Sequence, residues 1–312
     1  MGCALRKLVN CDFCDSNDST PIYVLVDVRL GLPGEYTLVR CGQCGLLYLD
    51  PQPSWDQLAS HYPWDYHCYD GGLDEEPSTF VRWAKRFGVR RRCRVVSQRR
   101  SSGRLLDVGC STGIFLDEMR HHGGWEVVGV EPVPAAAEYA KQHFGLDVYV
   151  GELLEGAFSP TSFDIVTLWD VLEHTPNPRA ILQEIYRILK PGGWIVMKAP
   201  DPDSWEAHFF GSCWVGFEAP QHLFGFPSEV LKNKLTEIGF ENIELAIIGS
   251  DYATFMTSLK IWLEKKDRQQ LGSIAGMFAR STWARVISMP VFTAMRSLGF
   301  RSSRVYFAQK PD

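Results

Sequence analysis

The segment "LLDVGCSTG", residues 105–113, combines a short apolar run, an acidic residue and a loop of small residues. Such a run predicts a buried strand that feeds a tight turn, a local structure that often cradles a nucleotide. A triphosphate-binding loop needs Lys followed by Ser or Thr, whereas this loop continues as Gly113-Ile114-Phe115. A dinucleotide fingerprint needs glycines at 109, 111 and 114, and only Gly109 fits. The loop therefore lacks the pattern of either phosphate-binding class.

The acid and the small residues fit a third kind of ligand. Asp107 lies two residues before Gly109, and Ser111 and Gly113 complete a turn without a phosphate cradle. The Asp107 carboxylate can pair with the ammonium of a zwitterionic amino-acid tail, and small residues let such a ligand approach the backbone. Glu131 ends the next predicted strand, where its carboxylate can accept hydrogen bonds from both hydroxyls of a ribose. Taken alone, Glu131 could equally be a solvated strand end.

Alternating strands and helices must position these residues. Near-continuous apolar strands separated by helices of ten or more residues predict a doubly wound, mostly parallel α/β sheet with both faces covered. The predicted strands are residues 104–109, 125–131, 146–150, 163–169, 194–199, 242–249 and 303–310. The predicted helices are 113–122, 134–144, 178–190 (stopped by Pro191-Gly192-Gly193), 228–240 and a helical stretch at 252–299.

Four motifs in this domain carry a family resemblance. "LLDVGCSTGIFLDEM", "VVGVEP", "FDIVTLWDVLEHTPNP" and "ILKPGGWIVMKAP" follow one another within residues 101–250 and resemble class I S-adenosylmethionine-dependent methyltransferases. The family commonly has Gly where this chain has Ser111. The resemblance implies a seven-stranded Rossmann-like sheet and a bound S-adenosylmethionine. The cofactor-binding positions that it implies are Asp107, Gly109, Cys110, Ser111, Gly113, Glu131, Pro132, Glu152, Leu153, Trp169 and Asp170. Trp169 and the tyrosines of residues 61–70 are candidates for attracting the sulfonium cation.

Two C-x-x-C pairs near the N-terminus have the spacing of a metal site. Four thiolates from Cys11, Cys14, Cys41 and Cys44 would form a closed, structural zinc site, and the alternative is unmetallated or redox-active cysteines. The odd number of nine cysteines and the lack of an export signal favour reduced thiols in the cytoplasm. The predicted organisation is a zinc-ribbon segment at 1–60, an aromatic connector and basic helix at 61–100, and the methyltransferase domain at 101–312. With "CGLLYLDPQPS", this beginning resembles a bacterial branch that modifies nucleotide-linked sugars and other cell-surface or secondary metabolites.

A general base is expected among the histidines beyond the strand ends, because a sugar hydroxyl must lose its proton to attack the methyl group. His222 lies in an aromatic-rich connection after the fifth domain strand and is the first candidate. His174, after the fourth strand, and Glu218 are the alternatives. The competing interpretations are that His222 only holds its loop by a hydrogen bond and that His174 packs at or caps a helix start.

The function expected from the sequence is methyl transfer to a small-molecule acceptor such as a nucleotide-linked or cell-surface sugar. The first alternative is an rRNA or tRNA methyltransferase, favoured by the basic run 82–104 and opposed by the net charge of -5. The second is a catalytically degenerate binding scaffold. The stretch 252–299 is expected to pack on the core or a dimer partner, or else to rest on a membrane as an amphipathic surface. Pro290 argues against one uninterrupted helix there, and the oligomeric state stays open.

Overall fold

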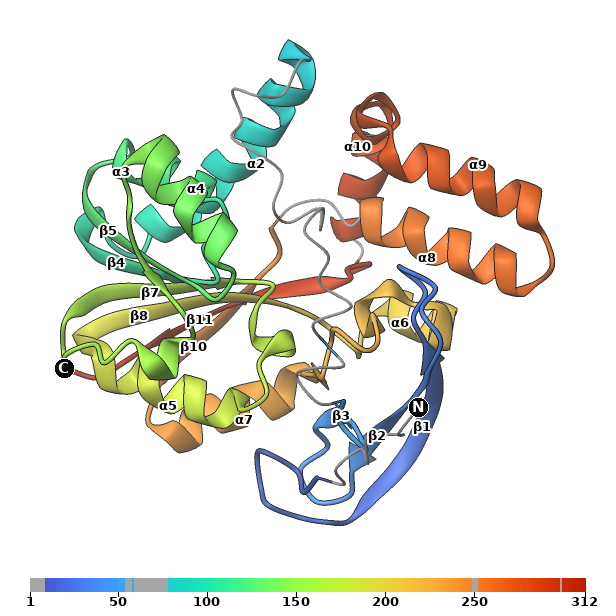
Figure 1. Ribbon diagram of the computed structural model, residues 1–312, viewed down its shortest axis with the longest axis horizontal. Helices are drawn as coiled ribbons and strands as arrows, with labels where there is room; N and C mark the ends of the chain where they lie inside the picture. Colours follow the sequence, from blue (N-terminus) through green and yellow to red (C-terminus); the bar gives the residue numbers. More distant parts are fainter. Residues whose placement is uncertain (1–8, 54–57, 59–77, 249–251, 298) are drawn as a thin grey trace.

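The computed structural model describes residues 9–53, 58, 78–248, 252–297 and 299–312. The connector tyrosines at 61–70 therefore lie outside the described residues. Within them, seven strands form one sheet in the order β10-β11-β8-β7-β4-β5-β6 (Figure 1). Their bounds are β4 (Ser102–Val108), β5 (Gly124–Glu131), β6 (Asp147–Val150), β7 (Phe163–Trp169), β8 (Leu189–Pro200), β10 (Glu241–Ala246) and β11 (Ser303–Gln309).

The sheet confirms the predicted fold class. Strands β6, β5, β4, β7 and β8 run parallel, and β11 enters antiparallel between β8 and β10. The central strands are buried along most of their length, which matches their continuous apolar sequences. Because neighbouring parallel strands end together, their carboxyl ends form a single edge of the sheet.

Helices cover both faces of the sheet (Figure 1). One face carries α2 (Thr79–Ser97), α3 (Ile114–Arg120) and α4 (Pro134–Phe144), and the other carries α5 (Pro178–Ile188) and α7 (Ser228–Ile238). Helix α5 ends at Ile188, two residues before its predicted end, and β8 begins at once with Leu189. Lys190 precedes Pro191, and a residue before proline is disfavoured in helical conformation.

The N-terminal segment forms a second, antiparallel sheet that is completed by a strand from the main domain. Strands β1 (Ser19–Val26), β2 (Glu35–Cys41) and β3 (Leu47–Leu49) pair in sequence, and β9 (Phe224–Gly225) adds the fourth strand. Tyr48 lies opposite Phe224 in this pairing. One continuous hydrophobic core joins the N-terminal residues Phe13 and Tyr48 to Phe226. The small sheet is therefore packed into the main domain.

The stretch between β10 and β11 folds into three helices, α8 (Tyr252–Lys265), α9 (Gln269–Arg280) and α10 (Thr282–Ser297). The breaks fall around Asp267 and at Ser281, whereas Pro290 lies inside α10. Short helix α6 (Trp205–Phe210) packs against α8. No helix among the described residues is both long enough and apolar enough to span a bilayer.

Candidate active site at the carboxyl edge of the sheet

The strand register brings the predicted cofactor residues to one edge of the sheet. Asp107 on β4 pairs with Thr167 on β7, and Trp169 at the end of β7 pairs with Lys198 on β8. Glu131 at the end of β5 pairs with Val150 on β6. Residues that are far apart in sequence therefore line one contiguous edge, the usual location of ligands in open α/β sheets.

The loop after β4 adopts a left-handed backbone at three positions. Gly109, Ser111 and Gly113 have φ values of 71°, 51° and 83°. A Cβ on Gly109 would lie 2.6 Å from Cγ2 of Val171, and a Cβ on Gly113 would lie 2.5 Å from Cδ1 of Leu146. Glycine is therefore required at 109 and 113 by both conformation and space. Ser111 takes the strained conformation with a small side chain.

Glu131 connects this loop to the next strand end. Its buried carboxylate accepts a hydrogen bond from the Ser111 backbone N–H at 2.8 Å and one from the Val133 N–H at 2.9 Å. Burial raises the pKa of Glu131, and the two backbone donors oppose that shift. Because each carboxylate oxygen can accept more than one hydrogen bond, the group can still meet ribose hydroxyls.

Asp107 is one of the predicted donor-binding residues, and its pairing with a ligand ammonium stays a prediction. Its carboxylate is buried and accepts a hydrogen bond from the Thr167 hydroxyl at 2.6 Å. Burial raises the pKa of Asp107 to about 7. The side chain thus supports the loop from below by joining β4 to β7.

The other loop positions divide between core and surface. The Cys110 thiol is buried, and a Cβ on Gly129 would lie 2.5 Å from its sulfur, so Cys110 can offer a ligand only backbone atoms. Leu153 is buried in the core, while Pro132 is exposed. Glu152 caps the short 3-10 helix Leu153–Glu155.

Trp169 and Asp170 follow β7 at the centre of the edge. The Trp169 ring meets Phe115 edge-on at 5.5 Å and lies 5.2 Å from the Arg92 guanidinium. Its indole N–H is buried without an acceptor among the described residues. A buried donor of this kind requires a partner, which a ligand carboxylate or ring nitrogen would supply.

The Asp170 carboxylate forms two hydrogen bonds with the Lys198 ammonium, at 2.6 and 2.7 Å. The cations of Lys198 and Arg92 lower the pKa of Asp170 against the effect of burial. Asp170 therefore stays ionised at the strand end, with one cation already bound.

The structure brings the three predicted catalytic candidates together. The rings of His174 and His222 meet edge-on with centroids 4.6 Å apart, and His222 Nε2 lies 3.8 Å from a Glu218 carboxylate oxygen. Nδ1 of His174 lies 3.0 Å from the Gln221 carbonyl, and Nδ1 of His222 lies 2.9 Å from the Gly216 carbonyl. A carbonyl can only accept, so each Nδ1 donates and each neutral ring has its lone pair at Nε2.

Two residues that were not predicted from the sequence complete this cluster. Arg29, in the turn between β1 and β2, forms an ion pair with Glu218 at 2.6 Å. Glu173 is buried, and neither of its carboxylate oxygens has a hydrogen-bond partner among the described residues. Burial and the nearby Asp170 charge raise the pKa of Glu173 well above its usual range. Glu173 directly precedes His174 in "VLEHT", but nothing in that pattern signals its burial.

The ligand atoms of Glu173, His174 and His222 lie within 4.8 Å of one another. Two imidazoles and a carboxylate are a donor set that can bind a divalent cation. Burial lowers the pKa of His174 to about 3, with a further contribution from His222. His174 is therefore a weak proton acceptor and a poor candidate for the base.

The aromatic residues of the connection around His222 divide between two regions of the structure. Trp214, Phe217 and Phe224 are buried in the core, and the Trp214 ring meets Phe217 edge-on at 4.8 Å. Trp205 and Phe209 lie partly exposed on α6, where the Phe209 ring stacks on Trp262 of α8. The connection thus contributes to two different regions.

The four N-terminal cysteines converge as their spacing predicts. All four sulfurs lie within 4.8 Å of one another, with Cys11 and Cys44 at 3.4 Å and Cys14 and Cys41 at 3.5 Å. Zinc–sulfur bonds in a tetrahedron imply sulfur–sulfur distances of about 3.8 Å. The hydrogen bond from Cys11 lowers the pKa of Cys44 to about 5 and raises that of Cys11. The donor set and its spacing fit a zinc ion.

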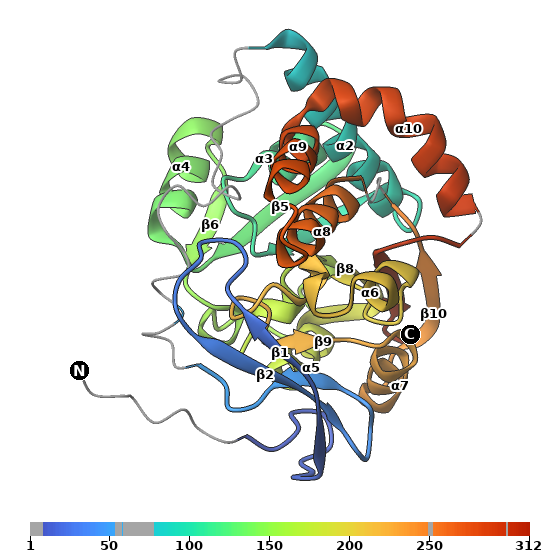
Figure 2. The same ribbon diagram turned by 90° about the vertical axis from the view of Figure 1, so that its right-hand side faces the viewer.

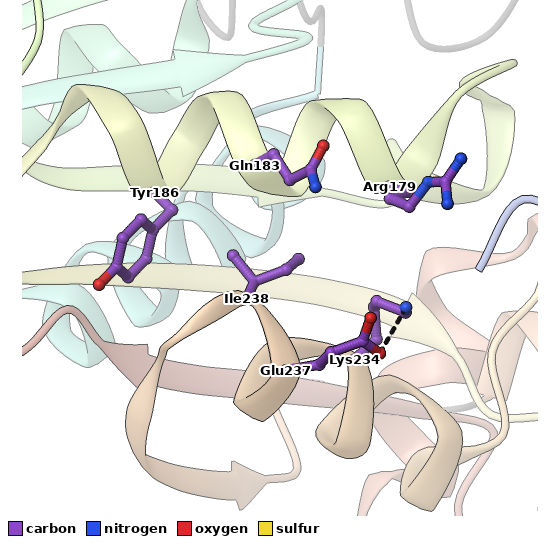
Figure 3. Close-up of a pocket in the computed structure, with 6 residues that line it drawn as sticks. All are labelled: Arg179, Gln183, Tyr186, Lys234, Glu237 and Ile238. Carbon is purple, nitrogen blue, oxygen red and sulfur yellow. Dashed lines mark hydrogen bonds and ion pairs between the residues drawn. The ribbon is translucent and has the colours of Figure 1, made fainter. Parts of the chain in front are cut away.

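The first cysteine turn packs against two helices of the main domain, α5 and α7. Arg179 at the start of α5 binds Asp15 at 2.7 Å, and Lys234 on α7 donates to the Phe13 carbonyl at 2.6 Å. A polar depression of about 220 Å³ lies beside these contacts, between α5 and α7 (Figure 3). It is lined by Arg179, Gln183, Tyr186, Lys234, Glu237 and Ile238. None of these residues belongs to the carboxyl edge, so the depression is separate from the candidate chemistry.

The comparisons with known proteins agree with this geometry. The sequence family described as "Methyltransferase domain" matches residues 80–245. The mitochondrial ubiquinone biosynthesis O-methyltransferase of Schizosaccharomyces pombe is 38% identical over 104 residues, which are 31% of this chain and 38% of that protein. Its Paracidovorax citrulli counterpart is 37% identical over 30% of this chain and 41% of its own length. This chain thus matches only about two fifths of these relatives.

Among the solved structures, one shares the fold of this chain. A methyltransferase-type structure from Galdieria sulphuraria is 14% identical, covers 77% of this chain and 90% of its own, and has a TM-score of 0.50. A SAM-dependent methyltransferase from Archaeoglobus fulgidus is 21% identical over 71% of this chain and 92% of its own, with a TM-score of 0.48. At 14% identity, the Galdieria structure shows the fold alone.

The sheet and its edge define the class I S-adenosylmethionine-dependent methyltransferase fold. Because the family match covers more than half of the residues, this chain belongs to the methyltransferase-domain family. The glycine cradle, Glu131 and the unpartnered indole N–H of Trp169 fit S-adenosylmethionine. The predicted enzyme class and methyl donor are confirmed at the level of the family.

Replacing Glu131 by Gln tests its contact with the ribose. The amide leaves only one acceptor oxygen for the ribose hydroxyls and the two backbone donors, so the affinity for S-adenosylhomocysteine should fall by about 1–3 kcal/mol. Titration calorimetry measures this loss. Glu126→Gln, on the exposed side of the same strand, is the matched control. Equal affinities for Glu131→Gln and the wild-type protein would reject the ribose contact.

The pKa of His174 predicts how stability depends on pH. An unfolded histidine binds a proton below about pH 6.5, whereas His174 in the folded chain stays neutral to about pH 3. Its contribution to stability is therefore complete above pH 6.5 and is lost as the pH falls, by at most about 1.4 kcal/mol per pH unit. His174→Asn keeps a donor for the Gln221 carbonyl and should flatten the urea-measured stability profile between pH 6 and 4. Parallel profiles would contradict the assignment.

Proposed function

We propose that this enzyme transfers the methyl group of S-adenosylmethionine to a hydroxyl of a small-molecule acceptor, with His222 as the general base. The observation that carries the proposal is the orientation of His222. Its Nδ1–H is held by the Gly216 carbonyl, so that Nε2 keeps its lone pair beside Glu218 and His174. A base must be oriented before it is useful, and this ring is fixed at its opposite nitrogen.

Each neighbour has a distinct role in this proposal. Glu218 would stabilise the imidazolium that forms when His222 takes the proton, while Arg29 orients the Glu218 carboxylate. His174, with its low pKa, would stay neutral and pack against His222. Trp169 and the loop after β4 would hold the donor, and alignment of the acceptor oxygen behind the methyl carbon would supply most of the rate.

The proposed acceptor is a hydroxyl-bearing metabolite such as a nucleotide-linked or cell-surface sugar. Two of the relatives are named O-methyltransferases of ubiquinone biosynthesis, which supports oxygen as the methylated atom. The resemblance of the N-terminal segment to sugar-modifying enzymes supports the sugar class. The rival, an RNA acceptor, would have to use the basic face of α2.

We also propose that the four N-terminal cysteines hold one structural zinc ion. A closed set of four thiolates leaves no position for a substrate, so the ion would stabilise its surroundings and take no part in methyl transfer. The first cysteine turn contacts Arg179 and Lys234, and the same N-terminal segment carries Arg29. Zinc would thereby support the residue that orients Glu218.

The substitution His222→Asn tests the base. The Asn amide can still donate to the Gly216 carbonyl but has no atom at the Nε2 position, so kcat should fall about 10²–10⁴-fold. The affinity for S-adenosylhomocysteine should stay within about twofold, because the base acts on the acceptor. Turnover is measured with labelled donor against a sugar-nucleotide pool and against total RNA.

His208→Asn is the matched control, since His208 on α6 also donates to a backbone carbonyl, at 2.8 Å from Ser204. Near-normal turnover of His222→Asn would reject the base. A second contradictory result is turnover that is abolished by a chelator and restored by a divalent cation without refolding of the N-terminal segment. That result would assign the Glu173, His174 and His222 cluster to a metal. Methylation confined to RNA would reject the acceptor class.

Metal analysis of protein purified without added metal tests the zinc site. We expect one zinc per chain, falling to less than half in Cys14→Ser and unchanged in Cys213→Ser, whose buried thiol lies outside the cluster. Chelation should expose the N-terminal sheet to hydrogen exchange before the main sheet, because the metal supplies local stability. Zinc near zero, with the four cysteines in disulfides, would refute the site.

A further inference from the structure

We infer that α2, α9 and α10 form a docking surface for an anionic lipid bilayer. These three helices lie at the same end of the molecule in both views (Figures 1 and 2). Their sequences combine exposed large apolar side chains with exclusively positive charge. The inference follows from how these side chains are distributed.

Helix α9 places its small residues inside and its large apolar residues outside. Gly272, Ala275 and Gly276 are buried, and a Cβ on Gly272 would lie 2.6 Å from the Glu264 side chain of α8. The opposite face exposes Leu271, Ile274, Met277 and Phe278. A helix that packs only on its own domain buries its large apolar residues, so this arrangement requires another apolar surface.

Helix α10 continues the apolar surface. Trp283, Ile287 and Val291 recur every four residues and therefore lie on one face of the helix. Ile287 is 76% exposed and Trp283 is 64% exposed. Residues with this spacing could enter the headgroup boundary of a bilayer together.

An aromatic stack joins α10 to the first half of α2. The Trp283 ring lies parallel to Phe80, with centroids 4.3 Å apart, and Phe80 is followed by Trp83 at 6.2 Å and Phe87 at 5.9 Å from Trp83. Trp83 is 60% exposed. Tryptophan is enriched at the level of lipid headgroups, because its ring is apolar and its N–H is polar.

The positive charges of α2, α9 and α10 favour an anionic partner. Every charged residue of α2, α9 and α10 is Arg or Lys, whereas the whole chain has a net charge of -5. The sequence from 268 to 311 contains no Asp or Glu. Arg280 and Arg285 are exposed beside the apolar stripes. Basic residues near the surface of an anionic membrane each contribute about fivefold to binding.

Other occupants fit these observations less well. A symmetric dimer through this surface would bring the same positive charges against one another. An RNA strand would satisfy the charges but would leave the stripe of Ile287 and Val291 without an apolar partner. A bilayer with anionic lipids satisfies both features. The second half of α2 reaches the donor site, where Arg92 lies against Trp169, so bound protein would hold that site near the membrane.

Vesicle co-sedimentation of the full chain tests this inference. We expect binding to phosphatidylcholine vesicles that contain phosphatidylglycerol, weakening with added salt, and little binding to pure phosphatidylcholine. Arg280→Ala/Arg285→Ala should lower the partition coefficient about 30-fold. Met277→Ser/Ile287→Ser should lower it about tenfold or more. The control Ile22→Ser/Val24→Ser, which removes exposed apolar residues from β1, should bind like the wild type.

Circular dichroism of each variant establishes that it is folded, and analytical ultracentrifugation gives its oligomeric state. Three results would overturn the inference. The first is no binding to anionic vesicles. The second is dimerisation of the wild type that Met277→Ser/Ile287→Ser abolishes, because the surface would then face a second copy. The third is RNA binding that the arginine variants weaken in the absence of vesicle binding. None of these measurements depends on turnover, so they stand apart from the test of His222.

Discussion

The carboxylate of Glu131 joins the two turns of the candidate donor site into one unit. It lies at the end of β5 and accepts hydrogen bonds from Ser111 in the loop after β4 and from Val133 in the turn after β5. In the first of these turns, Gly109, Ser111 and Gly113 adopt left-handed conformations. Ser111 is the non-glycine residue among them, and its left-handed conformation persists only where its surroundings fix it. The position of the loop, and therefore of any donor lying on it, depends on this buried anion.

A second set of contacts connects the N-terminal sheet to the proposed chemistry. Arg29 reaches across to Glu218, and β9 completes the small sheet only two residues after His222. The Leu223 N–H also donates to the Glu173 carbonyl, which fixes the connection against the end of β7. The connection that carries His222 is therefore held by the Arg29 side chain at Glu218 and by the Glu173 backbone at Leu223. The N-terminal segment thus contacts the candidate site through Arg29.

Local patterns in the sequence predicted most of the fold, the candidate residues at the carboxyl edge of the sheet and the cluster of four cysteines. The apolar runs and glycine turns gave β4 to β8 in order, and the spacing of Cys11, Cys14, Cys41 and Cys44 predicted their convergence. What escaped prediction depends on tertiary packing. No local sequence pattern indicates that the Glu173 carboxyl is buried or that Arg29 contacts Glu218. None indicates that α9 exposes its large apolar residues and buries its small ones. The aromatic residues of the run 205–224 divide between the core and the contact with α8, which only the folded chain determines.

The central claim is that the donor lies across the carboxyl edge with its ribose at Glu131 and its methyl-bearing sulfur toward His222. A crystal structure of the full chain with S-adenosylhomocysteine tests this most directly. The account predicts hydrogen bonds between the ribose hydroxyls and the Glu131 carboxylate, the homocysteine tail on the loop 109–113, and the sulfur on the side of the histidine pair. A ligand bound elsewhere, or one whose sulfur points away from His174 and His222, would contradict it.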